Sequence, residues 1–225
     1  MVRVLDYKYL FIDSLMKYKI LFTLILFLVG CDSGKKSDNS SPTLNQLTPE
    51  TGTYSLLIDD SELSWIGTEL STKTHTGTID FTDGTIVVDS DNTISGNVKI
   101  NMSTINVTDL QGRSKEMLER HLRSSDFFEV ESYSEAKFSF ISKSFDKLSN
   151  QISFVGDLTI KDITNPISFN ATLLETSPFL KAKAVLSFDR SKYNVRFRSG
   201  NFFENLGDKL ILDDIDVNIR LVTKK

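Results

Sequence analysis

A period of two in the apolar residues between positions 124 and 167 constrains the fold of this chain more than any other feature. Phe138 and Phe140 lie on alternate positions of one run, and the second run carries Ile152, Phe154, Leu158 and Ile160. The polar segment 146–150 separates the two runs, which predicts an antiparallel hairpin with one apolar and one solvated face. A hairpin of this kind is not stable alone, so other strands must cover its apolar face.

The same period recurs along most of the chain, in ten extended runs between Tyr54 and Leu221. Short polar segments separate neighbouring runs, among them Asp83–Gly84 and Asp89–Asn92, which we expect to be turns. Connections this short join antiparallel strands, and each run is apolar on one side only. The chain is therefore predicted to be all-β and folded as a sandwich or a closed barrel.

One segment, Arg113–Leu122, has the spacing of a helix instead. Leu118 and Leu122 are four residues apart, and Ser114 is in a position to cap the first turn. We expect this short helix to plug or cover one end of a barrel, with Leu118, His121 and Leu122 facing inward.

The inward positions of the predicted strands combine large aromatic residues with very small ones. The aromatic residues are Trp65, Phe81, Phe138, Phe140, Phe154, Phe169 and Phe188, and the small ones are Gly67, Gly77, Gly96, Gly156, Ala171, Ala182 and Ala184. Small inward residues either leave room for a ligand or let the walls bend tightly around a filled core. The pattern alone leaves both interpretations open.

The N-terminal segment has the pattern of an export signal. Lys17 and Lys19 precede an apolar run that ends just before Cys31, the single cysteine of the chain. About ten apolar residues are too few to span a bilayer, which takes about 20, so residues 1–30 are predicted to be a cleaved signal peptide, with a start at Met1 or at Met16 left open. The motif LVGC at Cys31 is similar to a bacterial lipobox, so we expect an exported lipoprotein, anchored to a membrane through lipidated Cys31 and facing the periplasm or the cell surface. The alternative is a free thiol after an ordinary signal peptide.

Charge and composition exclude several classes of function. Residues 31–51 are mostly polar and are predicted to be a flexible tether, which leaves 52–225 as the barrel domain. The formal charge of −4 becomes −6 when the four basic and two acidic side chains of residues 1–30 are removed from totals of 26 and 30. An acidic chain without a basic run is a poor candidate for binding nucleic acid, and no cysteine remains for a disulfide.

Three polar side chains are candidates for a role in a site. His75 shares the inward parity of Phe81 and either binds a ligand head group or is a satisfied core histidine. Arg190 is inward at the end of its strand, where it binds a ligand oxygen or, as we favour, pairs with an acid such as Asp213. His121 is expected to have a structural role, with the backbone or Asp126 as partner.

The segment that follows Arg190 is about nineteen residues long, which is uncommon unless the connection is functional or contains a short strand. It carries Tyr193, Arg196, Phe197, Phe202 and Phe203, a composition that suits a lid over an amphiphile. No catalytic motif is present, and the two histidines do not by themselves make a metal site, so we expect no enzyme activity, no metal and no cofactor.

Five stretches of the chain match, in order, the pattern of a known family. They are SELSWIGTELSTKTHTGTIDFTDGTI, NMSTINVTDL, HLRSSDFFEVESYSEAKFSF, VGDLTIKDITNPISF and FDRSKYNVRF, of which the run HLxSxDFFxVxxY is the most specific. On these residues the chain resembles the YceI-like family of exported lipocalin-like proteins, over about residues 52–223. His75 matches the family's strand histidine, His121 resembles its HL pair, and Asp162 stands where glycine is usual.

The resemblance implies an extended antiparallel barrel of eight strands with one helix, so two of the ten runs are expected to be halves of bent strands. It also implies a long apolar cavity that holds a polyisoprenoid or a similar long-chain amphiphile, such as an isoprenoid quinone or a fatty amide or acid. The expected function is to sequester or transport this ligand, with a homodimer left open. The alternatives are a surface lipoprotein with a packed barrel and a hydrolase.

Overall fold

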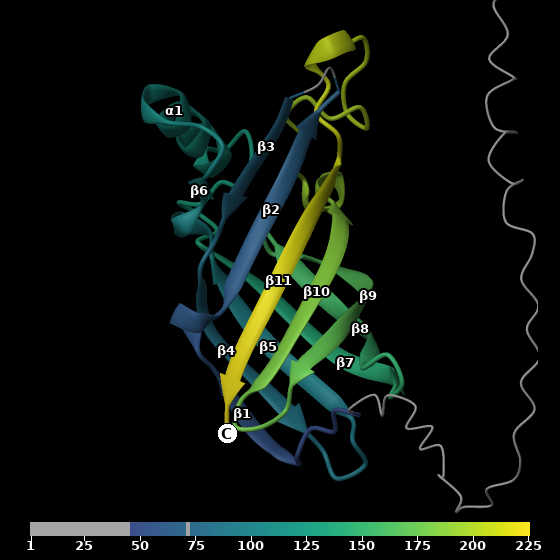
Figure 1. Ribbon diagram of the computed structural model, residues 1–225. Coiled ribbons are helices and arrows are strands. Elements are labelled where there is room, and N and C mark those ends of the chain that lie inside the picture. Colours follow the sequence, from purple (N-terminus) through teal and green to yellow (C-terminus); the bar gives the residue numbers. More distant parts are fainter. Residues whose placement is uncertain (1–45, 71–72) are drawn as a thin grey trace, which may run out of the picture. The chain divides into compact units, whose positions relative to one another are not determined.

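The computed structural model describes residues 46–70 and 73–225, which form one antiparallel β-barrel with a helix near one end (Figure 1). The described residues hold eleven strands in one sheet. The strands are β1 (Gly52–Leu56), β2 (Glu62–Glu69), β3 (Lys73–Thr78), β4 (Phe81–Val88), β5 (Ile94–Asn101), β6 (Asn106–Val107), β7 (Glu135–Asp146), β8 (Gln151–Ile160), β9 (Ile163–Glu175), β10 (Leu180–Asp189) and β11 (Asp214–Lys224).

The eleven strands amount to eight long ones, which confirms the predicted closed barrel. The first half of β11 pairs with β2 and its last residues pair with β1, so β1 and β2 are two parts of one strand. In the same way β3 continues into β4, and β5 continues into β6, because each half pairs with the corresponding half of its neighbour. The β1–β11 pairing closes the ring and leaves no open edge in this part of the sheet.

The three interrupted strands break side by side. Short 3₁₀ helices at Ile58–Asp60 and Met102–Thr104 interrupt the first and third of these strands. Between them, the amide of Asp80 donates to the hydroxyl of Thr104 (2.8 Å), and the amide of Asn101 donates to the carbonyl of Asp80 (2.9 Å). The three breaks therefore form one connected bend. Strands β2, β3 and β6 lie on the side of this bend nearer α1, and β1, β4 and β5 lie on the other side (Figure 1).

The hairpin that the period of two predicts is present as β7 and β8. Phe145 lies opposite Ile152, and the turn between the strands spans 147–150. Asp146 stabilises this turn by accepting hydrogen bonds from the amide of Leu148 (3.0 Å) and the hydroxyl of Ser149 (2.6 Å). Its carboxylate therefore provides hydrogen-bond acceptors for the turn, where the pairing between the two strands has ended.

Helix α1 (Gly112–Arg123) begins two residues before Ser114, so the predicted cap at Ser114 is wrong. Gln111 precedes the first turn without a side-chain cap, and Gly112 has a φ of +54°, a conformation that glycine adopts readily. The helix end is closed by the hydroxyl of Ser124, which donates to the carbonyl of His121 (2.8 Å). Within the described residues, no helix is long and apolar enough to cross a bilayer.

Four phenylalanine rings pack together across the middle of the barrel. Phe154 and Phe169 stack with centroids 5.1 Å apart, and the rings of Phe138 and Phe140 contact them at 5.3 to 5.8 Å. Each such pair is worth about 0.5–1.5 kcal/mol beyond its burial. The rings lie between two groups of buried side chains. We call them the upper core, which includes Leu122 of α1, and the lower core, which includes Tyr54 of β1.

Two predicted boundaries differ from the structure. Asp83 and Gly84 do not form a turn but lie inside β4, where an irregularity in the β4–β5 register absorbs an extra residue and Gly84 packs against Leu56. Leu47, which the sequence places in the tether, packs on the lower core, and its amide donates to the side chain of Asn150 (3.1 Å). Cys31 and the predicted signal peptide lie outside the described residues.

Candidate ligand cavity

A cavity of about 340 Å³ lies inside the barrel between the phenylalanine rings, α1 and the segment 190–212. Its volume falls within the range of about 300–1,000 Å³ that is typical of ligand pockets. The wall is mostly apolar, with residues from β2, β3, β5, β7, β8, β9, β10, β11 and α1, and includes Leu63, Trp65, Ile100, Leu118, Phe127, Phe138, Leu158, Leu186, Phe188, Ile215 and Val217.

The predicted site residues divide between this cavity and a second one of about 70 Å³ in the lower barrel. The large cavity is lined by Trp65, His75, Phe138, Phe188, Arg190 and Phe197, and the small one by Phe81, Phe138, Phe140, Phe154 and Phe169. Phe138 reaches both, because it belongs to the group of four rings between them. That these residues contact a ligand stays a prediction.

The candidate lid residues are also divided. Phe197 lines the cavity and packs edge-on against His121, with ring centroids 4.4 Å apart. Tyr193 is buried against Phe188, and burial, together with the charge of Asp189, raises the pKa of its hydroxyl to about 12 although a hydrogen bond with Asn165 opposes the shift. Three others, Arg196, Phe202 and Phe203, are exposed and line neither cavity.

The segment that carries these residues holds no strand but two 3₁₀ helices, Arg190–Tyr193 and Gly207–Lys209. Hydrogen bonds attach it to β2 and to the start of β11. The hydroxyl of Ser199 donates to Asp213 (2.8 Å), the residue before β11, and the amide of Leu212 donates to the carbonyl of Thr68 in β2 (2.8 Å). The segment thus lies at this end of the cavity, where Phe197 and Arg198 line it, and its role as a lid stays a prediction.

Arg190 is fully buried and pairs with Asp213, as predicted. Nη2 lies 3.1 Å from Oδ1 of Asp213, but it donates its hydrogen bond to the carbonyl of Ile211, so the contact with Asp213 is an ion pair rather than an aligned hydrogen bond. Nε and Nη1 donate to the carbonyls of Leu212 and Val195. Burial lowers the pKa of Arg190, and the nearby carboxylates of Asp213 and Asp189 offset part of this effect.

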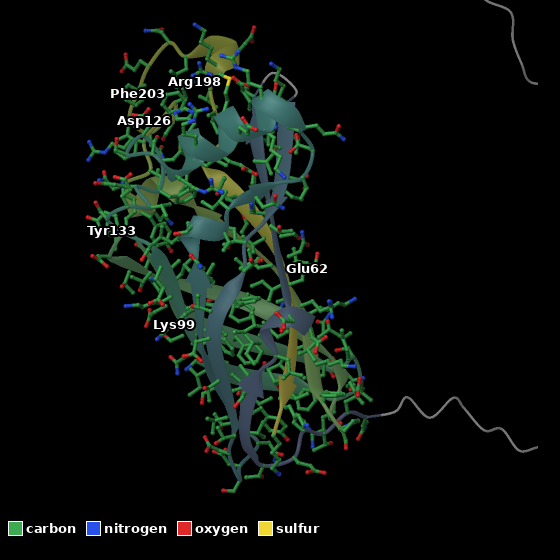
Figure 2. The ribbon with its side chains drawn as sticks, turned by 90° about the vertical axis from the view of Figure 1, so that its left-hand side faces the viewer. Glu62, Lys99, Asp126, Tyr133, Arg198 and Phe203 are labelled. Carbon is green, nitrogen blue, oxygen red and sulfur yellow. The ribbon has the colours of Figure 1, made fainter. Side chains whose placement is uncertain are left out.

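The opening of the cavity carries a second ion pair, which the sequence analysis missed. Glu69, the last residue of β2, lies 3.2 Å from Nη1 of Arg198, and both side chains line the cavity and are partly exposed. Figure 2 shows Arg198 at this end of the barrel, near Asp126 and Phe203, whereas Glu62 and Lys99 lie further along it. Glu69 follows Gly67 by two residues, so its inward parity could have indicated the position, but not the partner 129 positions away.

His75 in the cavity wall is paired with Asp109. Its Nδ1 lies 2.8 Å from Oδ2 of Asp109, and Oδ1 of the same carboxylate accepts from the amide of Thr76 (2.9 Å). Burial raises the pKa of Asp109, but the hydrogen bonds from Thr76 and His75 outweigh it and lower the pKa overall. The carboxylate is therefore ionised at neutral pH, and it orients the imidazole. Asp109 follows β6, and only the β3–β6 pairing brings it to His75.

His121 pairs with Asp126, as predicted. Nε2 lies 3.3 Å from Oδ2 of Asp126, and the imidazole packs edge-on against Phe127, with centroids 5.0 Å apart. Together with Leu118 and Leu122, which also line the cavity, His121 confirms the predicted inward face of α1.

Trp65 and Gly67 occupy the wall of β2 facing the cavity. The indole lies over Gly77 of β3, where a side-chain carbon would overlap the ring. Nε1 of Trp65 is buried, and no described residue accepts a hydrogen bond from it. Gly67 is different, because a carbon added there would meet only Ile215, at 3.7 Å.

The arrangement is suited to holding an apolar chain with a polar end. Among the described residues, no group of three histidine, cysteine or acidic side chains is placed to hold a metal ion. A closed eight-stranded barrel with an apolar interior and a short helix near one end defines a lipocalin-like barrel.

Comparison with known proteins identifies the group to which this barrel belongs. The model of the YceI-like domain matches residues 54–223, so the chain belongs to the YceI-like family. The UPF0312 protein plu2095 of Photorhabdus laumondii is 30% identical over 149 residues, which are 66% of this chain and 74% of that protein. Protein YceI of Escherichia coli O157:H7 is 34% identical over 98 residues, which are 44% of this chain and 48% of that protein.

Two solved structures have the same fold. BcnA of Burkholderia cenocepacia superposes with a TM-score of 0.59 at 19% identity, over 74% of this chain and 98% of BcnA. A polyisoprenoid binding domain from Saccharophagus degradans superposes with a TM-score of 0.54 at 14% identity, over 76% of this chain and 97% of that domain. At these identities the likeness supports the barrel fold.

Proposed function

We propose that the protein binds a long-chain amphiphile in the barrel cavity and sequesters or transports it through an aqueous compartment. The ligand class is a polyisoprenoid, an isoprenoid quinone or a fatty amide or acid. The observation that carries this proposal is the cavity of about 340 Å³, apolar along its wall and polar at its opening. The description of the Saccharophagus degradans relative as a polyisoprenoid binding domain supports the same ligand class.

The physical basis is the poor solubility of such chains in water. Burial of apolar surface is worth about 25 cal/mol per Å², and the cavity offers it within a barrel that has no unpaired edge between β1 and β11. We propose a binding role without catalysis, since His75 and Arg198 of the cavity wall are each paired with a carboxylate of the protein.

The test uses Trp65, the only tryptophan of the chain, which lies in the cavity wall. Addition of geranylgeraniol to delipidated protein should change the indole emission saturably, and organic extraction of protein purified from cells should release a long-chain lipid. Absence of both a saturable change and a copurifying lipid would favour a surface protein with a packed barrel. Turnover of an ester panel would favour a hydrolase.

We further propose that the protein is exported and anchored to a membrane through lipidated Cys31, on the basis of the motif at Leu28–Cys31. A Cys31→Ser variant should be recovered as soluble or unprocessed protein with an intact barrel. Recovery of the processed variant in the membrane fraction would contradict lipidation at Cys31.

A further inference from the structure

The charged side chains that line the large cavity are already paired within the protein. In the described part of the chain these are Glu69, His75, His121, Arg190 and Arg198. Each has a partner of opposite charge or a carboxylate within 3.3 Å. A ligand head group therefore meets ion pairs rather than isolated charges.

The two arginines are the only cations of the wall that do not depend on histidine protonation, among the described residues. Arg190 faces Asp213 and donates to three carbonyl groups, so its donors are directed into the protein. Arg198 is held by Glu69 at the opening. All three nitrogens of Arg190 are therefore occupied and cannot bind a phosphate or carboxylate in the bidentate way that arginine uses for anions, and the positive charge of Arg198 is offset by the carboxylate of Glu69.

The balance of charge around the cavity is also unfavourable to an anion. Four carboxylates, those of Glu69, Asp109, Asp126 and Asp213, accompany the two arginines. With both histidines neutral the acids are in excess, and with both protonated the charges are only balanced. An anionic head would thus exchange its hydration for a site without surplus positive charge.

One hydrogen-bonding atom of the wall remains unused, and it suits an uncharged head. Nε2 of His75 makes no hydrogen bond to another described residue. Since the carboxylate of Asp109 accepts from Nδ1, the neutral imidazole presents Nε2 as an acceptor.

We infer, building on the proposed function, that the cavity selects long-chain ligands with an uncharged, oxygen-bearing head group over the same chain carrying a phosphate, pyrophosphate or carboxylate. A hydroxyl or amide hydrogen of the ligand is accepted by Nε2 of His75. Anions are excluded at the opening because Arg198, the exposed cation there, is already paired with Glu69.

The test compares two probes with one chain, geranylgeraniol and geranylgeranyl pyrophosphate, by isothermal titration calorimetry on the delipidated protein. The alcohol should bind at least about tenfold more tightly. Equal or tighter binding of the pyrophosphate would overturn the inference and leave the proposed function intact. Failure of both probes to bind would overturn the proposed function and this inference with it.

Variants of the opening identify the cause of the selectivity. Glu69→Gln releases Arg198 and should shift the ratio of the two dissociation constants toward the pyrophosphate by about threefold or more, whereas Arg198→Gln should shift it the other way. The matched control is Glu62→Gln, on the same strand, whose pair with Arg220 is exposed on the outside of the barrel, and the ratio should not change. Circular dichroism checks that each variant is folded. If the ratio of the two dissociation constants is unchanged in both Glu69→Gln and Arg198→Gln, the role of the ion pair is refuted.

Discussion

Gly67 offers a direct test of whether the cavity is space that a ligand uses. A side-chain carbon added there would have one neighbour, the Cδ1 atom of Ile215 at 3.7 Å, an ordinary contact. Its φ is not in the left-handed region, so a side chain introduces no backbone strain there. A Gly67→Leu variant therefore directs its side chain into the cavity of about 340 Å³, and its Cβ meets the wall only at Ile215.

The expected magnitudes follow from the four carbons that leucine adds. If they exclude four carbons of the ligand, at about 0.8 kcal/mol each, binding weakens by about 3 kcal/mol, or roughly a hundredfold. The empty protein should not lose stability, since replacing a strand glycine gains about 0.5–1 kcal/mol. Melting of the delipidated protein and calorimetric titration with geranylgeraniol measure both quantities on the same sample.

The matched control is Gly156→Leu, another inward glycine on a barrel strand. A side-chain carbon there would overlap the carbonyl oxygen of Ser139 and crowd Phe138 and Phe140. This change overpacks the barrel and should cost about 1–3 kcal/mol or more, a fall of several degrees in melting temperature. If Gly67→Leu also lowers the melting temperature by several degrees and leaves the affinity unchanged, the reasoning is refuted, because the barrel is then filled by its own side chains.

Three further predictions concern stability. Lys161 and Asp162 in the β8–β9 turn both have positive φ, 51° and 58°. Asp162→Gly should remove the strain of a left-handed backbone at this position, stabilise the fold by about 0.5–1 kcal/mol and raise the melting temperature by a few degrees. A lower melting temperature would contradict this. Arg190→Met leaves the buried Oδ1 of the partly buried Asp213 without its cation and should cost about 3–5 kcal/mol in urea unfolding. Arg220→Met, in an exposed pair with Glu62, should cost about 1 kcal/mol or less. Equal losses would argue against a structural role for Arg190. Burial raises the pKa of Tyr193 to about 12, so the folded protein keeps this proton while the unfolded chain loses it from about pH 10. The contribution to stability is therefore full below pH 10, and it falls between pH 10 and 12 by up to about 1.4 kcal/mol per pH unit. Tyr193→Phe should remove this part of the slope, and parallel plots of unfolding free energy against pH for the two proteins would contradict the assignment.

The barrel itself could be predicted from local pattern. Alternation such as Phe138–Phe140 depends only on the two-residue period of a strand, and the Asp146–Asn150 turn depends on nearby side chains. The inward orientation of Trp65, Phe188 and Arg190 follows from the same parity. The pairing of Arg190 with Asp213 was predictable because both lie next to strand ends of the same inward parity.

What the sequence by itself determined is therefore the period, the inward set and the family to which the chain belongs. Only the tertiary structure decided which inward residues surround empty space and which fill it. Gly67 and Gly156 are equivalent in the pattern, yet one faces a cavity and the other the backbone of Ser139. The physical reason is that the cavity volume and the pairs Glu69–Arg198 and His75–Asp109 depend on how strands and loops pack together in the closed barrel. The paired residues are 34 and 129 positions apart, a separation that no local period encodes.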